Sequence, residues 1–306
     1  MIVLKNVCKT LAGKEVLKDV SFHIAHNESV GIIGLNGAGK TMLLDTMAGM
    51  IKPDSGFIRI NGQESLIGES RVCRDLTYVS GTRTQLWESV RVQASFDSCI
   101  EMYQTDKRTA AARLAELTRF FAIEEFLKQE PRSLSLGERM RCELVYAFLP
   151  APPLIMLDEV LLGLDVSVRH KILRYLEAYK REKRSTILYT SNRLSEVELL
   201  CDRVLLIDAG RIIFDGNTRH IMEIISPLYR MEVRTASPLP DFEDLPLERY
   251  CIDGERITIE YDKQKLETAQ LLRYLMERCE IKNVRLFEPD LEEAIRKIYG
   301  GNEWKR

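Results

Sequence analysis

Short apolar runs alternate with polar turn sequences along the first third of the chain. Residues 2–8 and 20–24 are rich in β-branched and apolar side chains, and Ala12-Gly13-Lys14 between them has turn composition. Apolar runs bounded by turn residues predict β-strands. A further strand is expected at residues 57–60, followed by the hairpin dipeptide Asn61-Gly62.

From about residue 88 to residue 149 the spacing of apolar positions becomes helical. Apolar side chains recur three or four residues apart in residues 106–121, at Ala111, Leu114, Leu117 and Phe121. This period is typical of an amphipathic helix. We therefore expect a helical subdomain over about residues 88–149.

Strands and helices then alternate. The pattern predicts strands at residues 154–157, 185–190 and 203–208, with helices at residues 167–183 and 195–200 between them. Strands separated by helices favour a parallel sheet with crossover connections. We expect an α/β fold whose main domain spans residues 1–225.

A proline-rich stretch lies near the C-terminal end. Residues 237–247 contain three prolines and three acidic residues, which is typical of a surface linker. Beyond it the pattern predicts a strand at 256–261, a helix at 265–279, a strand at 284–287 and a helix at 290–298. We expect a small C-terminal α/β domain over residues 226–306, connected by this linker.

Composition and charge narrow the class of protein. The 306 residues include 45% hydrophobic and 29% charged residues, which is ordinary for globular proteins and excludes collagen-like or disordered chains. The net charge of −2 gives no basic excess, so no nucleic-acid partner is expected. No signal peptide and no membrane-spanning run is predicted. The seven scattered cysteines, without a C-x-x-C pair, favour buried free thiols in a reducing cytosol.

A glycine-rich segment connects the apolar run at residues 29–34 to a predicted helix over 41–50. Its sequence, Gly34-Leu35-Asn36-Gly37-Ala38-Gly39-Lys40-Thr41, fits the phosphate-binding pattern G-x-x-x-x-G-K-[ST]. The glycines let backbone N–H groups turn inward, and the helix N-terminus adds positive charge. We expect Lys40 to contact the β- and γ-phosphates of ATP and the Thr41 hydroxyl to bind Mg²⁺.

Two acidic residues follow the apolar strand at residues 154–157. Phosphoryl transfer at such a loop requires an acid near the metal and a group that activates water. Asp158 is the predicted magnesium-associated acid, and Glu159 is the predicted general base. ATP and Mg²⁺ are thus the expected cofactors.

Two further segments complete a recognisable set. One segment lies ahead of the strand that ends at Asp158 and resembles the signature of ATP-binding cassette (ABC) proteins: Leu134-Ser135-Leu136-Gly137-Glu138. The other lies behind that strand and resembles the D-loop of the same family: Gly163-Leu164-Asp165. The resemblance covers about residues 1–225. It implies a P-loop NTPase cassette with a mixed sheet core and a helical subdomain. It also implies an ATPase that pairs head to tail with a second cassette, as a homodimer or heterodimer. Ser135, Gly137 and Glu138 would then contact in trans the nucleotide held by the partner.

Two stretches of the chain resemble export-type cassettes. They are residues 132–142 and the tail sequence Glu288-Pro289-Asp290-Leu291-Glu292-Glu293. That resemblance implies an ATP-binding subunit that couples ATP hydrolysis to a separate transmembrane permease, with transport directed outward. It implies a cytoplasmic protein, peripheral on the inner face of the cell membrane through the permease. The cargo is not encoded in this chain, because the permease forms the substrate path.

Four positions depart from the family pattern. Leu11 stands where an aromatic residue stacks on adenine, and it offers apolar contact without a π-face. Gly81 occupies the place of the Q-loop glutamine, with Gln85 four residues on as a candidate substitute. Asn192 replaces the switch histidine and can donate a hydrogen bond without carrying charge. Val160-Leu161 replaces a Pro-Thr pair, a change expected to affect packing.

These departures leave two interpretations. In the first, Lys40, Thr41, Asp158 and Glu159 hydrolyse ATP at a reduced rate with help from Asn192. In the second, the chain is a degenerate, weakly hydrolysing cassette paired with an intact one, whose site its own signature completes. The retained Glu159 favours the first, and the missing glutamine and histidine favour the second. A soluble nucleotide-gated ABC regulator is a further alternative.

Overall fold

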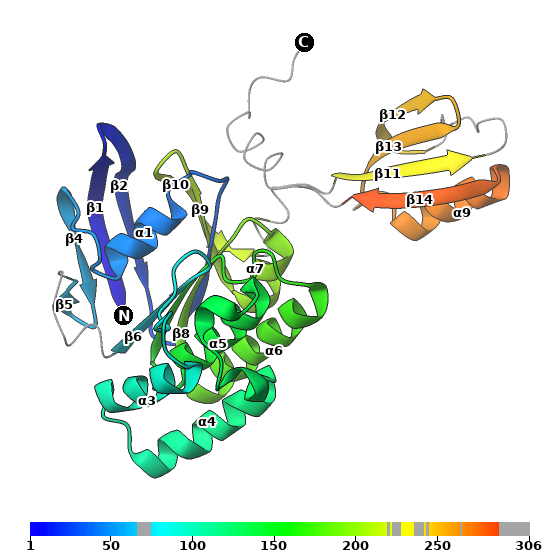
Figure 1. The fold of residues 1–306 in the computed structure, drawn as a ribbon. Coiled ribbons are helices and arrows are strands. Elements are labelled where there is room, and N and C mark those ends of the chain that lie inside the picture. Colours follow the sequence, from blue (N-terminus) through cyan, green and yellow to red (C-terminus); the bar gives the residue numbers. More distant parts are fainter. Residues whose placement is uncertain are drawn as a thin grey trace. The chain divides into compact units, whose positions relative to one another are not determined.

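The computed structural model describes residues 1–65, 75–218, 221, 228–235, 242, 245–263 and 265–287. Two compact units make up the chain, Met1–Thr218 and Arg219–Arg306 (Figure 1). The sequence had placed the boundary a few residues later, between residues 225 and 226. The first unit contains two sheets and the second unit contains one, and each unit has its own buried core.

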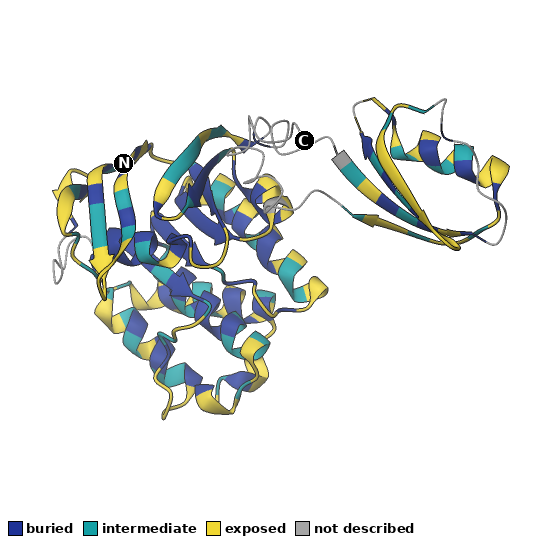
Figure 2. Cartoon of the chain, turned by 90° about the horizontal axis from the view of Figure 1, so that it is seen from above, coloured by how far each residue is buried: buried dark blue, intermediate teal, exposed yellow. Residues whose placement is uncertain are grey.

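The first unit is built around a six-stranded sheet in the order β10-β9-β3-β8-β7-β6. β3, β6, β7, β8 and β9 run parallel, and β10 pairs antiparallel with β9. All residues of β3, β7 and β8 are buried, as expected for strands covered on both faces (Figure 2). The predicted parallel sheet is confirmed; the pattern had not indicated β6 or β10. The strands are β3 (Ser29–Ile33), β6 (Leu76–Ser80), β7 (Leu154–Asp158), β8 (Thr186–Ser191), β9 (Arg203–Asp208) and β10 (Arg211–Asn217).

An antiparallel sheet, β2-β1-β4-β5, forms a second layer of this unit. Its hairpins turn at Ala12-Gly13 and Asn61-Gly62, where all four residues have positive φ, so both predicted turns are confirmed. Helix α1 (Lys40–Met47) packs its buried leucines into a cluster shared by both sheets. The strands are β1 (Ile2–Leu11), β2 (Lys14–Ile24), β4 (Ser55–Ile60) and β5 (Gln63–Glu64).

The other face of the six-stranded sheet carries helices (Figure 1). Val30 and Ile32 of β3 belong to the cluster around α1, while a Cβ on Gly31 between them would collide with Val197 of α7. Because side chains alternate across a strand, α1 and α7 lie on opposite faces. The helices are α3 (Val92–Met102), α4 (Lys107–Phe121), α5 (Leu136–Phe148), α6 (Val166–Lys183) and α7 (Leu194–Leu200), with short 3-10 turns at Glu124–Phe126 and Pro131–Ser133.

Helices α3, α4 and α5 fall within the block predicted to be a helical subdomain, residues 88–149. α4 begins where the sequence indicates, because the Asp106 carboxylate accepts a hydrogen bond from the N–H of Thr109 at 2.9 Å. It ends at Ala122, which adopts left-handed backbone geometry with φ of 49°. Together these helices form the end of the first unit remote from the antiparallel sheet (Figure 1).

The second unit is an antiparallel sheet, β12-β13-β11-β14, packed against helix α9. Met231, Val233, Ile257 and Ile259 of the sheet are fully buried with Leu271 of the helix. The predicted strands at 256–261 and 284–287 and the helix at 265–279 are present, and the helix predicted at 290–298 lies outside the described residues. The elements are β11 (Leu228–Thr235), β12 (Leu247–Asp253), β13 (Arg256–Asp262), α9 (Thr268–Arg278) and β14 (Ile281–Phe287).

The proline-rich stretch at residues 237–247 does not separate the two domains, and this prediction was wrong. β11 precedes the stretch and pairs with both β13 and β14. β12 begins at its end and belongs to the same sheet. The stretch therefore connects two strands within the second unit. Composition identifies a surface connection, but it carries no information about which elements the connection joins.

This topology changes where the chain can be shortened. A chain of residues 1–227 is expected to remain soluble and to bind ATP like the full chain. A chain of residues 1–238 is expected to aggregate, because it keeps β11 without its partner strands and exposes Met231 and Val233. Burial of each such side chain is worth about 1.5–3 kcal/mol. Sedimentation and binding of labelled ATP compare the two; a soluble 1–238 chain together with a 1–227 chain that cannot bind ATP would contradict this division.

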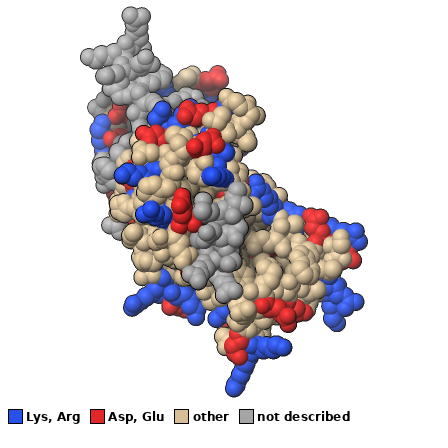
Figure 3. Space-filling model, turned by 90° about the vertical axis from the view of Figure 1, so that its left-hand side faces the viewer, with Lys and Arg blue, Asp and Glu red and all other residues tan. Residues whose placement is uncertain are grey.

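The charged side chains are distributed as expected for a chain with a net charge near zero. On the face shown in Figure 3, cationic and acidic side chains are interspersed. The described cysteines are free; Cys99, Cys142, Cys201 and Cys279 are buried, whereas Cys251 is exposed and Cys8 half-buried. The expectation of buried thiols thus holds for four of these six. No helix in the described ranges combines the length and the apolar character needed to cross a membrane.

Candidate nucleotide-binding and hydrolysis site

The glycine-rich segment at residues 34–41 links β3 to α1 and is shaped by two of its glycines. A Cβ on Gly34 would lie 2.3 Å from the main-chain oxygen of Ile207, so no larger residue fits there. Gly39 has φ of 112°, a conformation that favours glycine, immediately before α1. Leu35, Asn36 and Gly37 are exposed at the tip, while Ala38 is buried beneath them. The segment thus presents its backbone at the open end of a helix.

Lys40 lies beneath this loop. Its side chain is only 5% exposed, and its Nζ donates to the main-chain oxygens of Gly34 at 2.9 Å and Leu35 at 3.2 Å. The same Nζ lies 3.1 Å from Oε1 of Glu159. A buried ammonium group is stable only when paired and hydrogen-bonded. The loop therefore holds its cation next to the carboxylate predicted to be the base. Thr41 is exposed in the first turn of α1.

A threonine on the neighbouring strand orients both acidic residues. The hydroxyl of Thr190 donates to Oδ1 of the buried Asp158 at 2.7 Å and accepts from the N–H of Glu159 at 3.0 Å. Glu159 itself has φ of 50°, a strained geometry for a non-glycine residue that requires such support. The sequence analysis missed Thr190. Its role follows from the parallel register that pairs Asp158 with Thr190, which no local pattern reveals.

The donor set fits magnesium. Asp158 offers a carboxylate and Thr41 an exposed hydroxyl, and Mg²⁺ prefers such oxygen ligands completed by water and phosphate oxygens. The Tyr78 hydroxyl lies 3.4 Å from Oδ2 of Asp158. Burial, together with the charge of Asp158, raises the pKa of Tyr78, so this hydroxyl stays protonated and donates. Among the described residues, no cluster of three or more His, Cys, Asp or Glu side chains forms a separate metal site.

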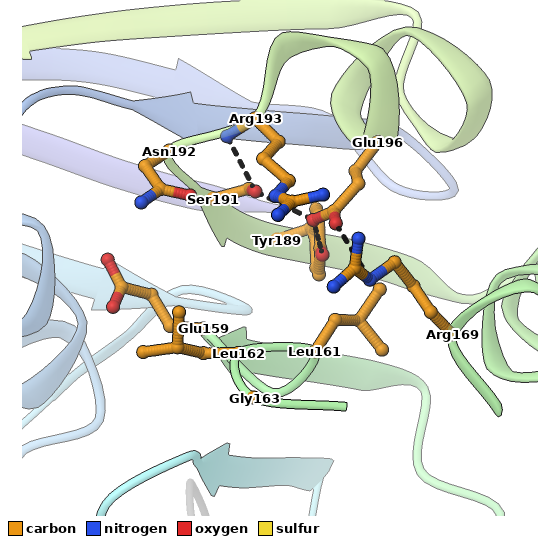
Figure 4. A pocket seen from close by; sticks show the side chains of 10 residues that line it. All are labelled: Glu159, Leu161, Leu162, Gly163, Arg169, Tyr189, Ser191, Asn192, Arg193 and Glu196. Carbon is orange, nitrogen blue, oxygen red and sulfur yellow. Dashed lines mark hydrogen bonds and ion pairs between the residues drawn. The ribbon is translucent and has the colours of Figure 1, made fainter. Parts of the chain in front are cut away.

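Asn192 and Glu159 line the same small cavity, of about 40 Å³. They come from the loops that follow β8 and β7, and they lie at the same end of the cavity (Figure 4). The loop that follows β8 is anchored on its buried side, where Oε2 of Glu196 accepts hydrogen bonds from the Tyr189 hydroxyl at 2.6 Å and from Ser191 Oγ at 2.7 Å. The exposed Asn192 and the half-buried Glu159 therefore face the same cavity.

Gly81 is sterically required at the place of the missing glutamine. Its N–H donates to the main-chain oxygen of Asp158 at 2.9 Å, and a Cβ there would lie 2.8 Å from the main-chain oxygen of Glu159. A glutamine at this position would displace the backbone of the predicted base. Gln85 does not take its place: its side-chain amide donates to the main-chain oxygen of Tyr78, so it is held against β6. The idea that Gln85 substitutes is contradicted by this geometry.

Leu11 ends β1 beside the turn of the first hairpin and is 53% exposed. The next strand passes close to the phosphate loop, since a Cβ on Gly39 would lie 3.1 Å from the main-chain oxygen of Val16. An apolar side chain on this hairpin is free to contact a nucleotide base. Val160 and Leu161, which stand in place of the Pro-Thr pair, are both buried, as expected for a change that affects packing.

The signature forms the N-terminus of α5. Ser135 Oγ accepts from the N–H of Glu138 at 3.4 Å, and the Glu138 carboxylate accepts from the N–H of Ser135 at 2.8 Å. This capping box lowers the pKa of Glu138. Gly137 has room for a side chain within its own chain, since a Cβ would make only ordinary contact, 3.6 Å from Leu164. The packing of one chain therefore does not explain a glycine at this position.

Comparison with known proteins gives consistent matches. The ABC transporter family model matches residues 17–161. The linearmycin resistance ATP-binding protein LnrL of Bacillus subtilis is 30% identical, over 71% of this chain and 69% of that protein. The molybdate/tungstate import ATP-binding protein WtpC of Thermococcus kodakarensis is 31% identical, over 67% and 62%.

Two further matches extend this picture. The Nod factor export ATP-binding protein I of Rhizobium johnstonii is 29% identical over 98% of this chain and 94% of that protein, so it spans both units. A solved structure of the ATP-binding subunit of an ABC transporter matches with a TM-score of 0.68 at 30% identity, covering 73% of this chain and 92% of that one. The fold of the first unit is that of these proteins.

Proposed function

The chain belongs to the ABC transporter ATP-binding proteins, and we propose that it binds ATP with Mg²⁺ at residues 34–41 and couples ATP hydrolysis to a separate membrane permease. The cassettes of this family are ATPases. The observation that carries the proposal for this chain is the 3.1 Å pair between Lys40 and Glu159 at the mouth of the phosphate loop. The pair supports the proposal because the cation proposed to bind phosphate lies next to the carboxylate proposed to act as the base.

The chemistry follows from these positions. Lys40 neutralises the β- and γ-phosphates, and Glu159 accepts a proton from the water that attacks the γ-phosphorus, with ADP as the leaving group. Thr41 and Asp158 would hold Mg²⁺, which would neutralise charge on the phosphate oxygens. Thr190 keeps Asp158 and Glu159 in place, since its hydroxyl bonds to both residues.

Turnover is proposed to be slow. Asn192 supplies a neutral donor where a potentially cationic histidine would stand, and Gly81 brings no side chain to the site. Loss of one preorganised donor of transition-state charge costs about 10²–10³ in rate. The retained base Glu159 supports a slow ATPase. The alternative is a cassette that mainly holds nucleotide for an intact partner, and it is supported by the absence of the glutamine at position 81 and of the histidine at position 192.

Asn192→His is expected to raise steady-state phosphate release by up to about tenfold, because the imidazole replaces the neutral amide donor with a donor that can carry positive charge. Purified wild type and variant are compared at saturating ATP and Mg²⁺, with Lys40→Ala as the inactive control. Equal rates in all three proteins would contradict a self-sufficient enzyme and favour the degenerate-partner interpretation.

A second cassette is proposed as a partner, either another copy of this chain or a different one. Ser135, Gly137 and Glu138 form the start of a capped helix, which favours an anion at its N-terminus. The open space at Gly137 suits close approach of a phosphate from outside the chain. These residues would complete the partner's ATP site in trans.

The permease is proposed to dock in an apolar hollow of the first unit. The hollow has a volume of about 330 Å³ and is lined by residues that include Met50, Leu76 and Tyr103. The side chain of Met50 is 50% exposed at its rim. A docked permease would place this chain at the inner face of the membrane. Copurification with a multi-spanning membrane protein tests the partnership and separates it from a soluble regulator.

Outward transport is the favoured direction. One of the relatives that align over both units, the Nod factor export ATP-binding protein I, is named for export. LnrL is named for resistance to linearmycin, whereas WtpC, an import protein, aligns over 67% of the chain. Vesicles of defined orientation containing the chain and its permease test the direction of transport. Net uptake into inverted vesicles supports export; uptake into right-side-out vesicles alone would contradict it.

A further inference from the structure

The strand β12 of the second unit is exposed along most of its length. Among the described strands it lies at one end of the sheet order β12-β13-β11-β14 (Figure 1). Residues 248–253 are all exposed, and they include two large apolar side chains, Tyr250 at 49% and Ile252 at 42%. The edge of a sheet is a template for pairing with another strand, and proteins often protect it with lysine or proline. Residues 247–253 contain neither.

The hairpin between β12 and β13 sets the direction of the β12 backbone groups. Asp253 and Arg256 are cross-strand partners on either side of a two-residue turn, so they form the hydrogen-bonded pair that closes the hairpin. Hydrogen-bonded and non-hydrogen-bonded positions alternate along an antiparallel strand. The N–H and C=O groups of Ile252 and Tyr250 therefore point away from β13. A further strand that approached this edge would pair with them.

Side chains alternate between the two faces of β12. Tyr250 and Ile252 lie on the face that carries the core, because their partners on β13 are buried isoleucines. The opposite face carries Arg249, Cys251 and Asp253. The exposed strand thus offers apolar side chains on one face and both signs of charge on the other.

We propose that β12 pairs antiparallel with β12 of a second copy of this chain, about a twofold axis at Cys251. In this register Arg249 lies opposite Asp253 of the second copy. Tyr250 lies opposite Ile252 of the second copy, and the symmetry repeats both pairs. Pairs of opposite charge, and pairs of an aromatic with a β-branched side chain, stabilise neighbouring strands. The side chains of β12 are therefore complementary to themselves.

The side-chain pairs select this register. An axis at Tyr250 would instead place Asp253 opposite Leu247 of the second copy. It would also place Ile252 opposite Glu248. Both pairs set a charged side chain against an apolar one, so a shift of the axis by one residue loses the favourable contacts.

The strand at the other end of the sheet, β14, does not fit a second copy of itself. Its charged residues are Lys282 and Arg285, and residues 281–287 contain no acid. Antiparallel pairing of two such strands would bring cations together, which is unfavourable. β12 is therefore the strand of this sheet that suits self-pairing.

This pairing involves the second unit alone and goes beyond the ATP site. It makes another copy of this chain, rather than a different cassette, the partner proposed above. The contact between two strands is smaller than the surface of about 1,200 Å² that stable interfaces bury. We therefore expect the pairing to be weak and to depend on protein concentration.

Oxidation of the full chain with diamide, which accepts the two hydrogen atoms of a thiol pair, probes the axis. In the proposed register Cys251 and its counterpart form a non-hydrogen-bonded pair, with Cα atoms about 4.5 Å apart, and a disulfide spans about 4.4–6.8 Å. We expect a covalent dimer and a cross-linked peptide that contains Cys251 twice. Cys251→Ser should lose this product.

Glu248→Cys/Cys251→Ser is the matched control for random collision of thiols. It keeps one exposed thiol on β12, but six residues of strand, about 20 Å, would separate position 248 from its counterpart across the axis. That distance is too long for a disulfide, so we expect no cross-link at this position.

Ile252→Lys is expected to lower the yield of the Cys251 cross-link at least about tenfold, because a lysine would face Tyr250 at both symmetric positions. The Ile252 side chain is already 42% exposed, so the variant should fold, which thermal unfolding checks. Met276→Lys is the matched control, since Met276 is 70% exposed on α9 of the same unit. Its yield should equal that of the wild type.

Three results would overturn the pairing. The first is a wild-type chain that yields no peptide with Cys251 linked to Cys251. The second is equal cross-linking by Glu248→Cys/Cys251→Ser, and the third is an unchanged yield in Ile252→Lys, because both would indicate random collision. None of these measurements uses ATP, so each result bears on the pairing and leaves the proposed ATP site unaffected.

Discussion

Lys40→Ala is expected to lower the affinity for ATP at least about 100-fold, because each charged hydrogen bond to phosphate is worth about 1.5–3 kcal/mol and this ammonium serves two phosphates. The loop at residues 34–41 contains no second cation. The substitution also leaves the Glu159 carboxylate without the cation that lies 3.1 Å away, so its charge would repel the γ-phosphate. Both effects act in the same direction.

Equilibrium binding of labelled ATP with Mg²⁺ measures this loss. Lys52→Ala removes an exposed lysine outside the loop and serves as the matched control, with affinity expected to equal that of the wild type. Thermal unfolding of the same samples shows whether the variant is folded. An affinity for Lys40→Ala within a few-fold of the wild type would contradict the assignment of residues 34–41 as the phosphate site.

Glu159→Gln is expected to bind ATP but to hydrolyse it about 10²–10⁴ times more slowly, which is the usual contribution of a general base. The amide keeps the size of the side chain and leaves the Thr190 hydrogen bond to the Glu159 main chain intact. It removes the proton acceptor and the negative charge next to the γ-phosphate. The variant should therefore accumulate in an ATP-loaded, paired state.

Single-turnover hydrolysis tests the first part, and size-exclusion chromatography with ATP and Mg²⁺ tests the second. Glu116→Gln, on the exposed face of α4, is the control for loss of one acidic charge. Wild-type hydrolysis by Glu159→Gln would exclude Glu159 as the base. A variant that stays monomeric with ATP, alone and with each candidate partner cassette, would contradict head-to-tail pairing.

The sequence by itself determined those elements that depend only on the spacing of residues close together along the chain. The phosphate loop follows from glycines at fixed spacing between a strand and a helix, and the structure joins β3 to α1 there. The acids Asp158 and Glu159 follow a short run of apolar residues whose length is typical of a buried strand, and the structure has β7 there. Periodicity located α4 and α6 for the same reason: a helix shows its buried face every three or four residues.

Only the tertiary structure decided which distant residues meet. Thr190 bonds to both acids because β8 lies beside β7 in a register that the sequence of neither strand specifies. Gly81 is a glycine because the backbone of Glu159 approaches it, an approach fixed by the order of strands in the sheet. β11 belongs with β13 and β14 across the proline-rich stretch for the same physical reason. Backbone pairing between strands is non-local, so composition reveals that a strand forms but not the neighbour whose hydrogen bonds it shares.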